Sequence, residues 1–242
     1  MRVVSLVPSL TELLYHLQAN VVGITKFCVH PDIWYRTLPR VSGTKNPDLK
    51  RIQTLQPDLI IANYEENRRE DVEALQQITN VLITNIVTLE DAMNEIIRIG
   101  RACKAETSAI QLSKTIDVLW KPLKNSARNL RVVYLIWRKP YMAAGTDTFI
   151  HHVITHIGLK NAVQTARYPK LHAEEIRTLR PDVLFLSSEP YPFKEKHIEE
   201  LNQYVPDSHI VLVNGEAFSW YGYRMIPSSV YLSSLITHLN HL

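Results

Sequence analysis

The segment Cys-Val-His-Pro at 28–31 carries two side chains whose types and spacing are typical of metal chemistry. A thiolate and an imidazole two residues apart can share a metal ion, or either can give one axial ligand to a metal complex. Cys28 and His30 are therefore candidate metal ligands. The plainer interpretation is a loop cysteine followed by a turn histidine before a proline. A nucleophilic role is weaker, because no third residue can be named that would orient the pair.

Aromatic side chains form a second group of candidates, because they recur just after apolar runs that are typical of strands. The members of this group that we expect to contact a ligand are Phe27, Tyr64, Trp137, Tyr168, Phe218, Trp220 and Tyr221. Aromatic residues in loops suit a large, flat or apolar ligand. The alternative is ordinary packing between two parts of the protein.

The segments that we expect to position these residues occur twice in the sequence. The phrase IQTLQPDLIIA at 52–62 returns 124 positions later as IRTLRPDVLFL at 176–186. Each copy predicts a short helix, a stop at Pro-Asp and a buried strand. Upstream, RVVSLVP at 2–8 and RVVYLIW at 131–137 predict buried parallel strands, each followed by a helix. In the first helix, Ser9 and Glu12 have the spacing of a capping box. The sequence therefore predicts two similar α/β lobes.

Residues 88–124 separate the two copies. This stretch has no proline before Pro122 and carries apolar residues at spacings of three and four. It predicts one helix of roughly 30 residues, about 45 Å long at 1.5 Å per residue. The expected fold is α/β, with two Rossmann-like lobes of parallel sheet flanked by helices and joined by one long backbone helix. The expected domains are 1–87, the linking helix 88–124, and 125–242. The default ligand site is the cleft between the lobes, at the carboxyl ends of the strands.

Composition excludes several classes of function. The chain has 242 residues, a net charge of +3 and 45% hydrophobic residues, which gives no sign of nucleic-acid binding. Seven glycines and no glycine-rich phosphate motif argue against a nucleotide cofactor. The two cysteines make no disulfide framework. The chain begins Met-Arg and enters a strand at once, so we expect no signal peptide in it. A cytoplasmic protein and a mature extracytoplasmic protein both fit that start.

The order of these segments resembles a known family. RVVSLVPSLTELLYHLQANVVGITKFCVHP, the paired Pro-Asp phrases, the long segment between them and HAEEIRTLRPDVLFLSSEPYPF are similar to the class III, or helical-backbone metal receptor, periplasmic substrate-binding proteins. The resemblance covers 2–240. It implies a transport protein without catalysis and without an intrinsic cofactor. It also implies that the protein is a monomer, that its ligand is cobalamin or an iron complex, and that its partner is an ABC importer permease.

The resemblance also carries residue roles. In cobalamin-binding members of the class, aromatic residues of both lobes sandwich the corrin, and amides such as Asn67 are expected to meet its side chains. The positions that match such contacts are Phe27, Tyr64, Tyr168, Glu216, Phe218, Ser219 and Trp220. A family tryptophan before the first phrase is replaced by a polar residue near Lys45. An acid that docks on the permease is kept as Glu174, whereas the matching position in the first copy is Lys50.

Two alternatives remain open at this point. In the first, the fold binds a ferric siderophore or haem, and arginines pair with its carboxylates. The arginines near strand ends are Arg36, Arg68, Arg138, Arg167 and Arg224. In the second, the scaffold is a cytoplasmic metal-handling protein or enzyme that uses Cys28 and His30 with Glu65 or Glu216.

Overall fold

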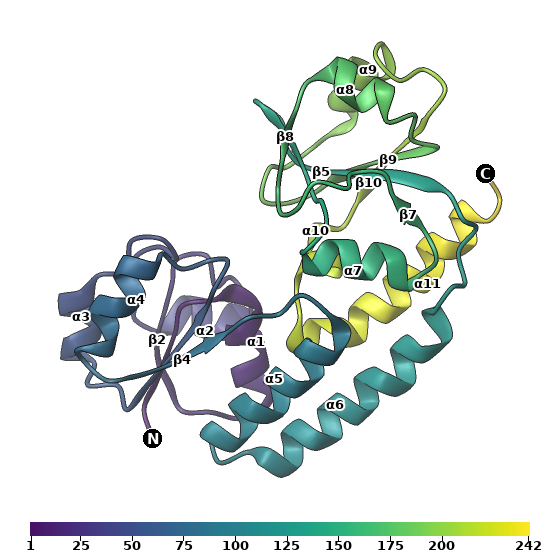
Figure 1. Cartoon of the computed structure of the whole chain (residues 1–242). Coiled ribbons are helices and arrows are strands. Elements are labelled where there is room, and N and C mark those ends of the chain that lie inside the picture. Colours follow the sequence, from purple (N-terminus) through teal and green to yellow (C-terminus); the bar gives the residue numbers. More distant parts are fainter. The chain divides into compact units, whose positions relative to one another are not determined.

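The computed structural model describes all residues, 1–242, and contacts within the chain group them into two compact units (Figure 1). The first unit comprises Met1–Ile86, Glu90–Ile116 and Tyr221–Arg224. The second comprises Val87–Leu89, Asp117–Trp220 and Met225–Leu242. Each unit contains one β-sheet with helices on both faces. The predicted α/β class with two lobes is confirmed.

The sheet of the first unit is fully parallel, in the order β2-β1-β3-β4. Its strands are β1 (Val3–Ser5), β2 (Val21–Ile24), β3 (Leu59–Asn63) and β4 (Asn80–Thr84). The inner strands β1 and β3 are buried along their whole length. This is expected of apolar strands that are covered on both faces.

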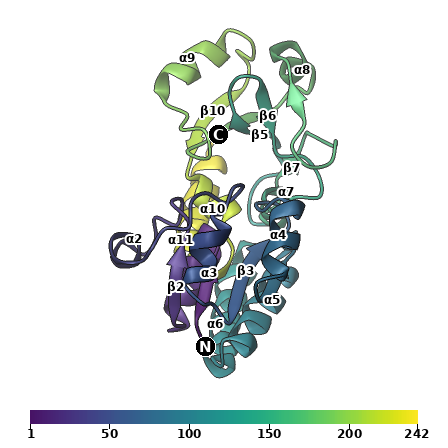
Figure 2. The ribbon, with the colours of Figure 1, turned by 90° about the vertical axis from the view of Figure 1, so that its left-hand side faces the viewer.

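Helices cover both faces of this sheet. In Figures 1 and 2, α3 (Leu49–Thr54) and α4 (Arg69–Gln76) lie on one face. Ile52 of α3 and Leu75 of α4 pack there in one core cluster with the strands. On the other face lie α1 (Pro8–His16) and α5 (Leu89–Ala102). The short helix α2 (Asp32–Thr37) follows β2.

The sheet of the second unit repeats this order and adds two strands. Its strands are β5 (Arg131–Trp137), β6 (Tyr141–Ala143), β7 (Lys160–Asn161), β8 (Lys170–Leu171), β9 (Val183–Ser187) and β10 (His209–Val213). The parallel series β7-β5-β9-β10 matches β2-β1-β3-β4 of the first unit. However, β6 is antiparallel to β5 and β8 is antiparallel to β6, so this sheet is mixed. The expectation of two purely parallel sheets is wrong for the second unit.

The helices of the second unit complete the repeat. They are α7 (Phe149–His156), α8 (Ala173–Thr178), α9 (Glu195–Asn202), α10 (Gly215–Ser219) and α11 (Met225–Leu239). Helices α8 and α9 lie on one face of the sheet, and α7, α10 and α11 lie on the other (Figure 1). A 3₁₀ turn, η2 (Gly222–Arg224), lies between α10 and α11 and belongs to the first unit.

The repeated phrase has the same structural role in both units. The Asp58 carboxylate accepts a hydrogen bond from the backbone N–H of Arg2 at 2.6 Å. The Arg2 guanidinium donates to the carbonyl of Leu55, at the end of α3, at 2.8 Å. The second unit repeats these contacts at 2.6 and 2.9 Å with Asp182, Arg131 and Leu179. The Pro-Asp phrase therefore ties a helix end to the start of the central strand.

The prediction of one continuous helix over 88–124 is wrong. This segment forms α5, α6 (Glu106–Trp120) and the 3₁₀ turn η1 (Lys121–Leu123). The chain reverses at Lys104, which has a left-handed φ of 60°, and the N–H of Ala105 donates to the Gly100 carbonyl at 2.7 Å. A Cβ on Gly100 would lie 2.2 Å from the Cβ of Ala109, so the two helices approach closely at this glycine. Neither glycine nor proline occupies the turn itself, and the apolar spacing therefore runs through it.

The predicted capping box at Ser9 is also wrong. Helix α1 begins two residues earlier than this capping box requires, at Pro8, and Val7 occupies the N-cap position. Proline is favoured in the first helical turn because its missing N–H would have no helical partner there. Ser9 is buried, and its hydroxyl has no hydrogen-bond partner. Glu12 instead forms an ion pair of 2.7 Å with Arg224 of η2.

Candidate functional site

In the first unit, two predicted ligand contacts follow parallel strands and are exposed. Phe27 follows β2 with 51% of its surface exposed, and Tyr64 follows β3 with 68% exposed. The N–H of Phe27 donates to the Thr25 hydroxyl at 3.3 Å, and the N–H of Tyr64 donates to the Thr84 carbonyl at 2.9 Å. Backbone contacts therefore fix both loops while the aromatic rings stay accessible.

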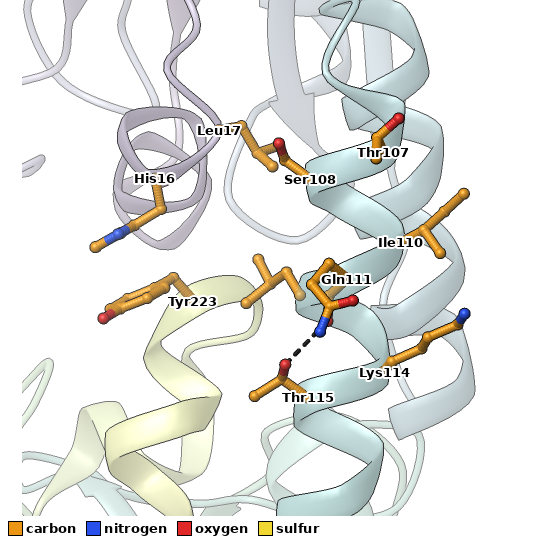
Figure 3. Close-up of a pocket in the computed structure, with 10 residues that line it drawn as sticks. His16, Leu17, Thr107, Ser108, Ile110, Gln111, Lys114, Thr115 and Tyr223 are labelled. Carbon is orange, nitrogen blue, oxygen red and sulfur yellow. Dashed lines mark hydrogen bonds between the residues drawn. The ribbon is translucent and has the colours of Figure 1, made fainter.

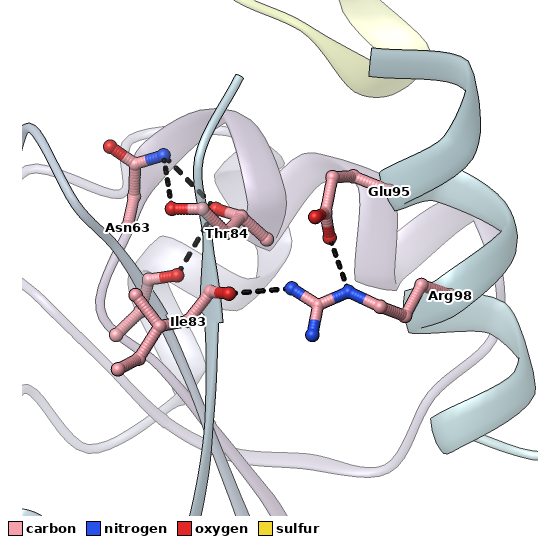
Figure 4. Close-up of polar contacts among 6 residues, drawn as sticks. Asn63, Ile83, Thr84, Glu95 and Arg98 are labelled. Atoms are coloured by element: carbon pink, nitrogen blue, oxygen red, sulfur yellow. Dashed lines mark hydrogen bonds and ion pairs between the residues drawn. The ribbon is translucent and has the colours of Figure 1, made fainter. Parts of the chain in front are cut away.

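A polar network holds the end of β3, and Figure 4 shows its contact between Asn63 and Thr84. Asn63 donates its side-chain amide to the Thr84 hydroxyl at 3.0 Å and accepts the N–H of Glu65 at 2.8 Å. Asn67 accepts the N–H of Asn63 and donates to the Thr44 carbonyl, both at 2.8 Å. Asn67 is buried, and these two hydrogen bonds use its amide oxygen and one amide N–H within the protein. Contact between Asn67 and ligand amides stays a prediction.

Figure 4 also shows how α5 is attached to the edge strand of this unit. The Arg98 guanidinium donates to the Ile83 carbonyl of β4 at 2.5 Å and to the Glu95 carboxylate at 2.7 Å. Because the guanidinium bridges helix and strand, it fixes α5 beside the carboxyl end of β4.

The structure does not support Cys28 as half of the predicted metal pair, whereas His30 is half-buried and its role as an axial ligand stays a prediction. Cys28 has no exposed surface, and its sulfur accepts a hydrogen bond from the Thr11 hydroxyl at 3.0 Å and contacts the Thr25 hydroxyl at 3.2 Å. Burial raises the pKa of this thiol, although its hydrogen bonds to Thr11 and Thr25 oppose the shift, and a neutral thiol is a poor metal ligand. No three His, Cys, Asp or Glu side chains gather in a way that could hold a metal ion. Cys28 is a core residue of the loop that carries Phe27.

In the second unit, Trp137 ends β5 and remains 40% exposed. Its ring packs edge-on against Tyr191, with centroids 5.7 Å apart. Tyr168, another predicted contact, is half-buried, and the Arg167 guanidinium lies 6.0 Å from its ring. Trp137 and Tyr191 thus form an aromatic surface at the carboxyl ends of β5 and β9, which we call the Trp137 platform.

Polar side chains surround the Trp137 platform. Glu200 of α9 accepts hydrogen bonds from Arg138 at 2.5 Å and from the Tyr141 hydroxyl at 2.8 Å. The hydrogen bond from Arg138 lowers the pKa of the Glu200 carboxyl, which keeps it ionised. The Tyr191 hydroxyl lies 3.2 Å from Nε2 of His197, which is buried. Charged groups beside the aromatic rings are therefore already paired.

The segment around α10 contains the remaining predicted contacts, and Phe218 is one that the structure excludes. Its ring has no exposed surface and packs against Tyr134 and Phe185 at 5.1 and 5.7 Å. The prediction that Phe218 contacts a ligand is therefore wrong. Within α10, Gly215, Ala217 and Phe218 are the buried residues.

The other members of this segment lie closer to the surface or near polar partners. Glu216 and Ser219 are half-buried, and Trp220 and Tyr221 are buried. The Glu189 carboxylate accepts hydrogen bonds from the Ser219 hydroxyl at 2.7 Å and from the Trp220 indole N–H at 2.9 Å. Glu189, which follows β9, therefore holds both side chains in place.

Sequence reasoning missed Tyr191, Glu189, Glu200 and His197. Glu189 and Tyr191 follow a predicted strand in the segment SSEPYPF, so their position was a usable signal. Glu200 and His197 lie within a helix that is far from Trp137 in sequence. Only the tertiary fold brings α9 to the end of β5.

The five arginines considered for an anionic ligand all have carboxylate partners. Arg68 pairs with Asp71 at 2.8 Å, Arg138 with Glu200 at 2.5 Å and Arg36 with Asp32 at 2.7 Å. The other pairs are Arg167–Asp147 at 3.7 Å and Arg224–Glu12 at 2.7 Å. None of the five offers an uncompensated charge to an anionic ligand.

A hollow of about 650 Å³ lies elsewhere in the first unit, beside α1 and α6 (Figure 3). The His16 ring stacks on Tyr223 with centroids 3.2 Å apart, and Gln111 and Thr115 line the α6 side. Burial, and then the charge of Arg224, lower the pKa of His16. Helix α1 runs back from the carboxyl end of β1, so this hollow lies away from Phe27 and Tyr64.

Glu174 and Lys50 occupy equivalent positions on the two copies of the repeated helix. Glu174 is exposed in the first turn of α8, and Lys50 is exposed at the second residue of α3. The two helices thus present opposite charges at matching places.

No helix of the protein is both long enough and apolar enough to cross a membrane.

Known proteins resemble this chain in sequence and in structure. The family described as periplasmic binding protein matches residues 3–208. A vitamin B12-binding protein of Vibrio parahaemolyticus is 29% identical over 195 residues, covering 77% of this chain and 70% of that protein. The periplasmic vitamin B12-binding protein of Vibrio cholerae gives a TM-score of 0.83 at 18% identity, covering 100% of this chain and 98% of its own. The periplasmic haem-binding protein of Vibrio cholerae gives 0.82 at 20% identity, covering 97% and 98%.

Proposed function

Because this chain belongs to the periplasmic binding protein family, whose members bind solutes and are not enzymes, we propose that it binds a corrinoid for an ABC importer. The observation that carries the proposal is the exposure of Phe27, Tyr64 and Trp137 at the carboxyl ends of strands in both units. Exposed aromatic rings supply the apolar contact area that the faces of a corrin ring require. The 29% identical relative is itself a vitamin B12-binding protein.

The chemistry of the exposed residues supports a ligand held without a bond from the protein to cobalt. Cys28 is buried and its thiol is kept neutral, so the aromatic side chains carry the contact. In this proposal Tyr168, Glu216, Ser219, Trp220 and Tyr221 complete the ligand site. The protein itself has no intrinsic cofactor; the metal complex is its cargo.

Ferric siderophore or haem binding is the rival function on this fold. Haem binding is known for the Vibrio cholerae protein with a similar fold. The paired state of all five strand-end arginines argues against it, because an anionic ligand would have to displace a carboxylate from its partner. We therefore place the corrinoid first.

The proposed partner is the permease of an ABC importer, which the protein meets outside the cytoplasm as a monomer. Glu174 on α8 would face a basic patch of that permease, whereas Lys50 on α3 would require an acidic or neutral one. The proposed docking surface is therefore asymmetric in charge.

The first test is a titration of the purified protein with cyanocobalamin, followed by calorimetry and visible absorbance. We expect one-to-one binding with an unchanged cobalt spectrum, because the Cys28 thiol is buried and neutral; a shifted spectrum would instead point to His30 as a cobalt ligand. Haemin serves as the comparison ligand. Tight binding of haemin without binding of cyanocobalamin would overturn the corrinoid proposal in favour of haem binding.

A further inference from the structure

The hydrogen bonds at the Trp137 platform have a defined direction. The backbone N–H of Lys194 donates to Nδ1 of His197 at 2.8 Å. A ring nitrogen that accepts a hydrogen bond carries no hydrogen, so the neutral ring has its hydrogen on Nε2. Burial, and then the charges of Arg138 and Lys196, lower the pKa of His197, which keeps the ring neutral. Nε2 is therefore the donor and the Tyr191 hydroxyl oxygen is the acceptor, at 3.2 Å.

This direction leaves the Tyr191 hydroxyl hydrogen available. The oxygen of Tyr191 faces two positively polarised neighbours, His197 and the Arg138 guanidinium. Its own O–H must then point away from both. Tyr191 is half-buried and packs edge-on against the exposed ring of Trp137, so both side chains belong to one surface that a ligand can contact.

The charge beside Tyr191 is already balanced. Arg138 donates to Glu200 through both Nη2 and Nε, at 2.5 and 3.2 Å, and Tyr141 donates to the other carboxylate oxygen. A ligand carboxylate at this place would gain no net positive charge and would lie near the ionised Glu200. An amide carbonyl accepts a hydrogen bond without that repulsion.

We propose that Tyr191 donates its hydroxyl hydrogen to an uncharged acceptor of the ligand, such as an amide carbonyl, and that Glu200 excludes carboxylates by neutralising Arg138. This inference rests on the proposed function and specifies which part of the ligand meets the second unit. It favours a ligand that carries amide groups at its edge over one that carries carboxylates there.

The first experiment compares Tyr191→Phe with the wild-type protein in a cyanocobalamin titration. We expect Kd to rise about three- to tenfold, as for loss of one hydrogen bond. Tyr15→Phe, in the first unit, removes an exposed tyrosine hydroxyl away from the proposed site and is expected to leave Kd unchanged. Thermal melting of both variants checks that each is folded.

The second experiment measures a gain of binding, with thermal melting to check that the variant is folded. Glu200→Gln keeps the hydrogen-bond acceptor for Arg138 and removes the negative charge. We expect this variant to bind haemin, which carries two carboxylates, at least tenfold more tightly than the wild-type protein does.

The outcomes separate the two proposals. If the wild type binds cyanocobalamin while Tyr191→Phe binds equally well, the function stands and the role of Tyr191 is overturned. If Glu200→Gln leaves haemin affinity unchanged, the role of Glu200 is overturned. Wild-type binding of haemin alone, or of neither ligand, overturns the corrinoid function and this inference together.

Discussion

Phe27 and Phe218 are both aromatic residues that follow predicted strands, yet their surroundings give them different roles. Phe27 is 51% exposed, whereas Phe218 has no exposed surface and packs against Tyr134 and Phe185. The sequence assigns both to one ligand site, because residue type and position after a strand are the same. Burial is a property of the folded core, and it separates a contact residue from a core residue.

Substitution of Phe27 and of Phe218 by alanine is expected to affect ligand affinity and the free energy of unfolding differently. Phe27→Ala is expected to weaken cyanocobalamin binding about tenfold and to change the free energy of unfolding by less than about 0.5 kcal/mol, because the ring is largely exposed. Phe218→Ala is expected to lower the free energy of unfolding by about 3–5 kcal/mol, because it leaves a cavity in the core. Urea denaturation and calorimetric titration of both variants measure the two effects. Equal stability losses in the two variants would contradict the assignment.

The repeated elements show how the sequence duplicates a structure. The order β7-β5-β9-β10 repeats β2-β1-β3-β4, and each copy uses Pro-Asp to tie a helix to its central strand. The same residues occur twice because the same backbone groups need partners in each unit. By contrast, the turn at Lys104 has no counterpart in any sequence rule, because its left-handed residue is a lysine rather than a glycine.

The contact between the Pro-Asp carboxylate and the central strand, which occurs in both units, predicts equal effects of two distant substitutions. Asp58→Ala and Asp182→Ala each remove a carboxylate that accepts a backbone N–H at 2.6 Å. We expect each to lower the free energy of unfolding by about 1 kcal/mol, the usual net worth of one hydrogen bond. Denaturation curves of the two single variants provide the measurement. Asp207→Ala, which lies outside the Pro-Asp phrase, is the control. If it lowers the free energy of unfolding as much as Asp58→Ala and Asp182→Ala do, the Pro-Asp phrase has no special role.

At the scale of the whole molecule, three histidines affect stability in the same direction. The pKa values of His16, His151 and His197 are all lowered, with burial as the largest cause. The unfolded chain then binds protons more readily than the folded chain below a pH of about 6.5, the usual pKa of histidine. Both units contain such a residue, so the effect belongs to the protein as a whole.

The protein is therefore expected to lose stability as the pH falls from about 7 to about 5. The sign follows because folding keeps these rings neutral while unfolding lets them take up protons. Urea denaturation at several pH values in this range is the measurement. In His197→Gln the loss is expected to be smaller than in the wild type, and a stability that stays constant down to about pH 5 would refute the expectation.

The sequence by itself determined the α/β class, the duplication and the strand ends at which candidate site residues lie. Those features depend on apolar periodicity and on the repeated Pro-Asp phrase, which are local. The tertiary structure decided the break between α5 and α6, the antiparallel strands β6 and β8, and the burial of Cys28 and Phe218. It also brought Glu200 and His197 of α9 to Arg138 and Tyr191. These outcomes depend on packing between segments far apart in the chain, and local sequence does not record it.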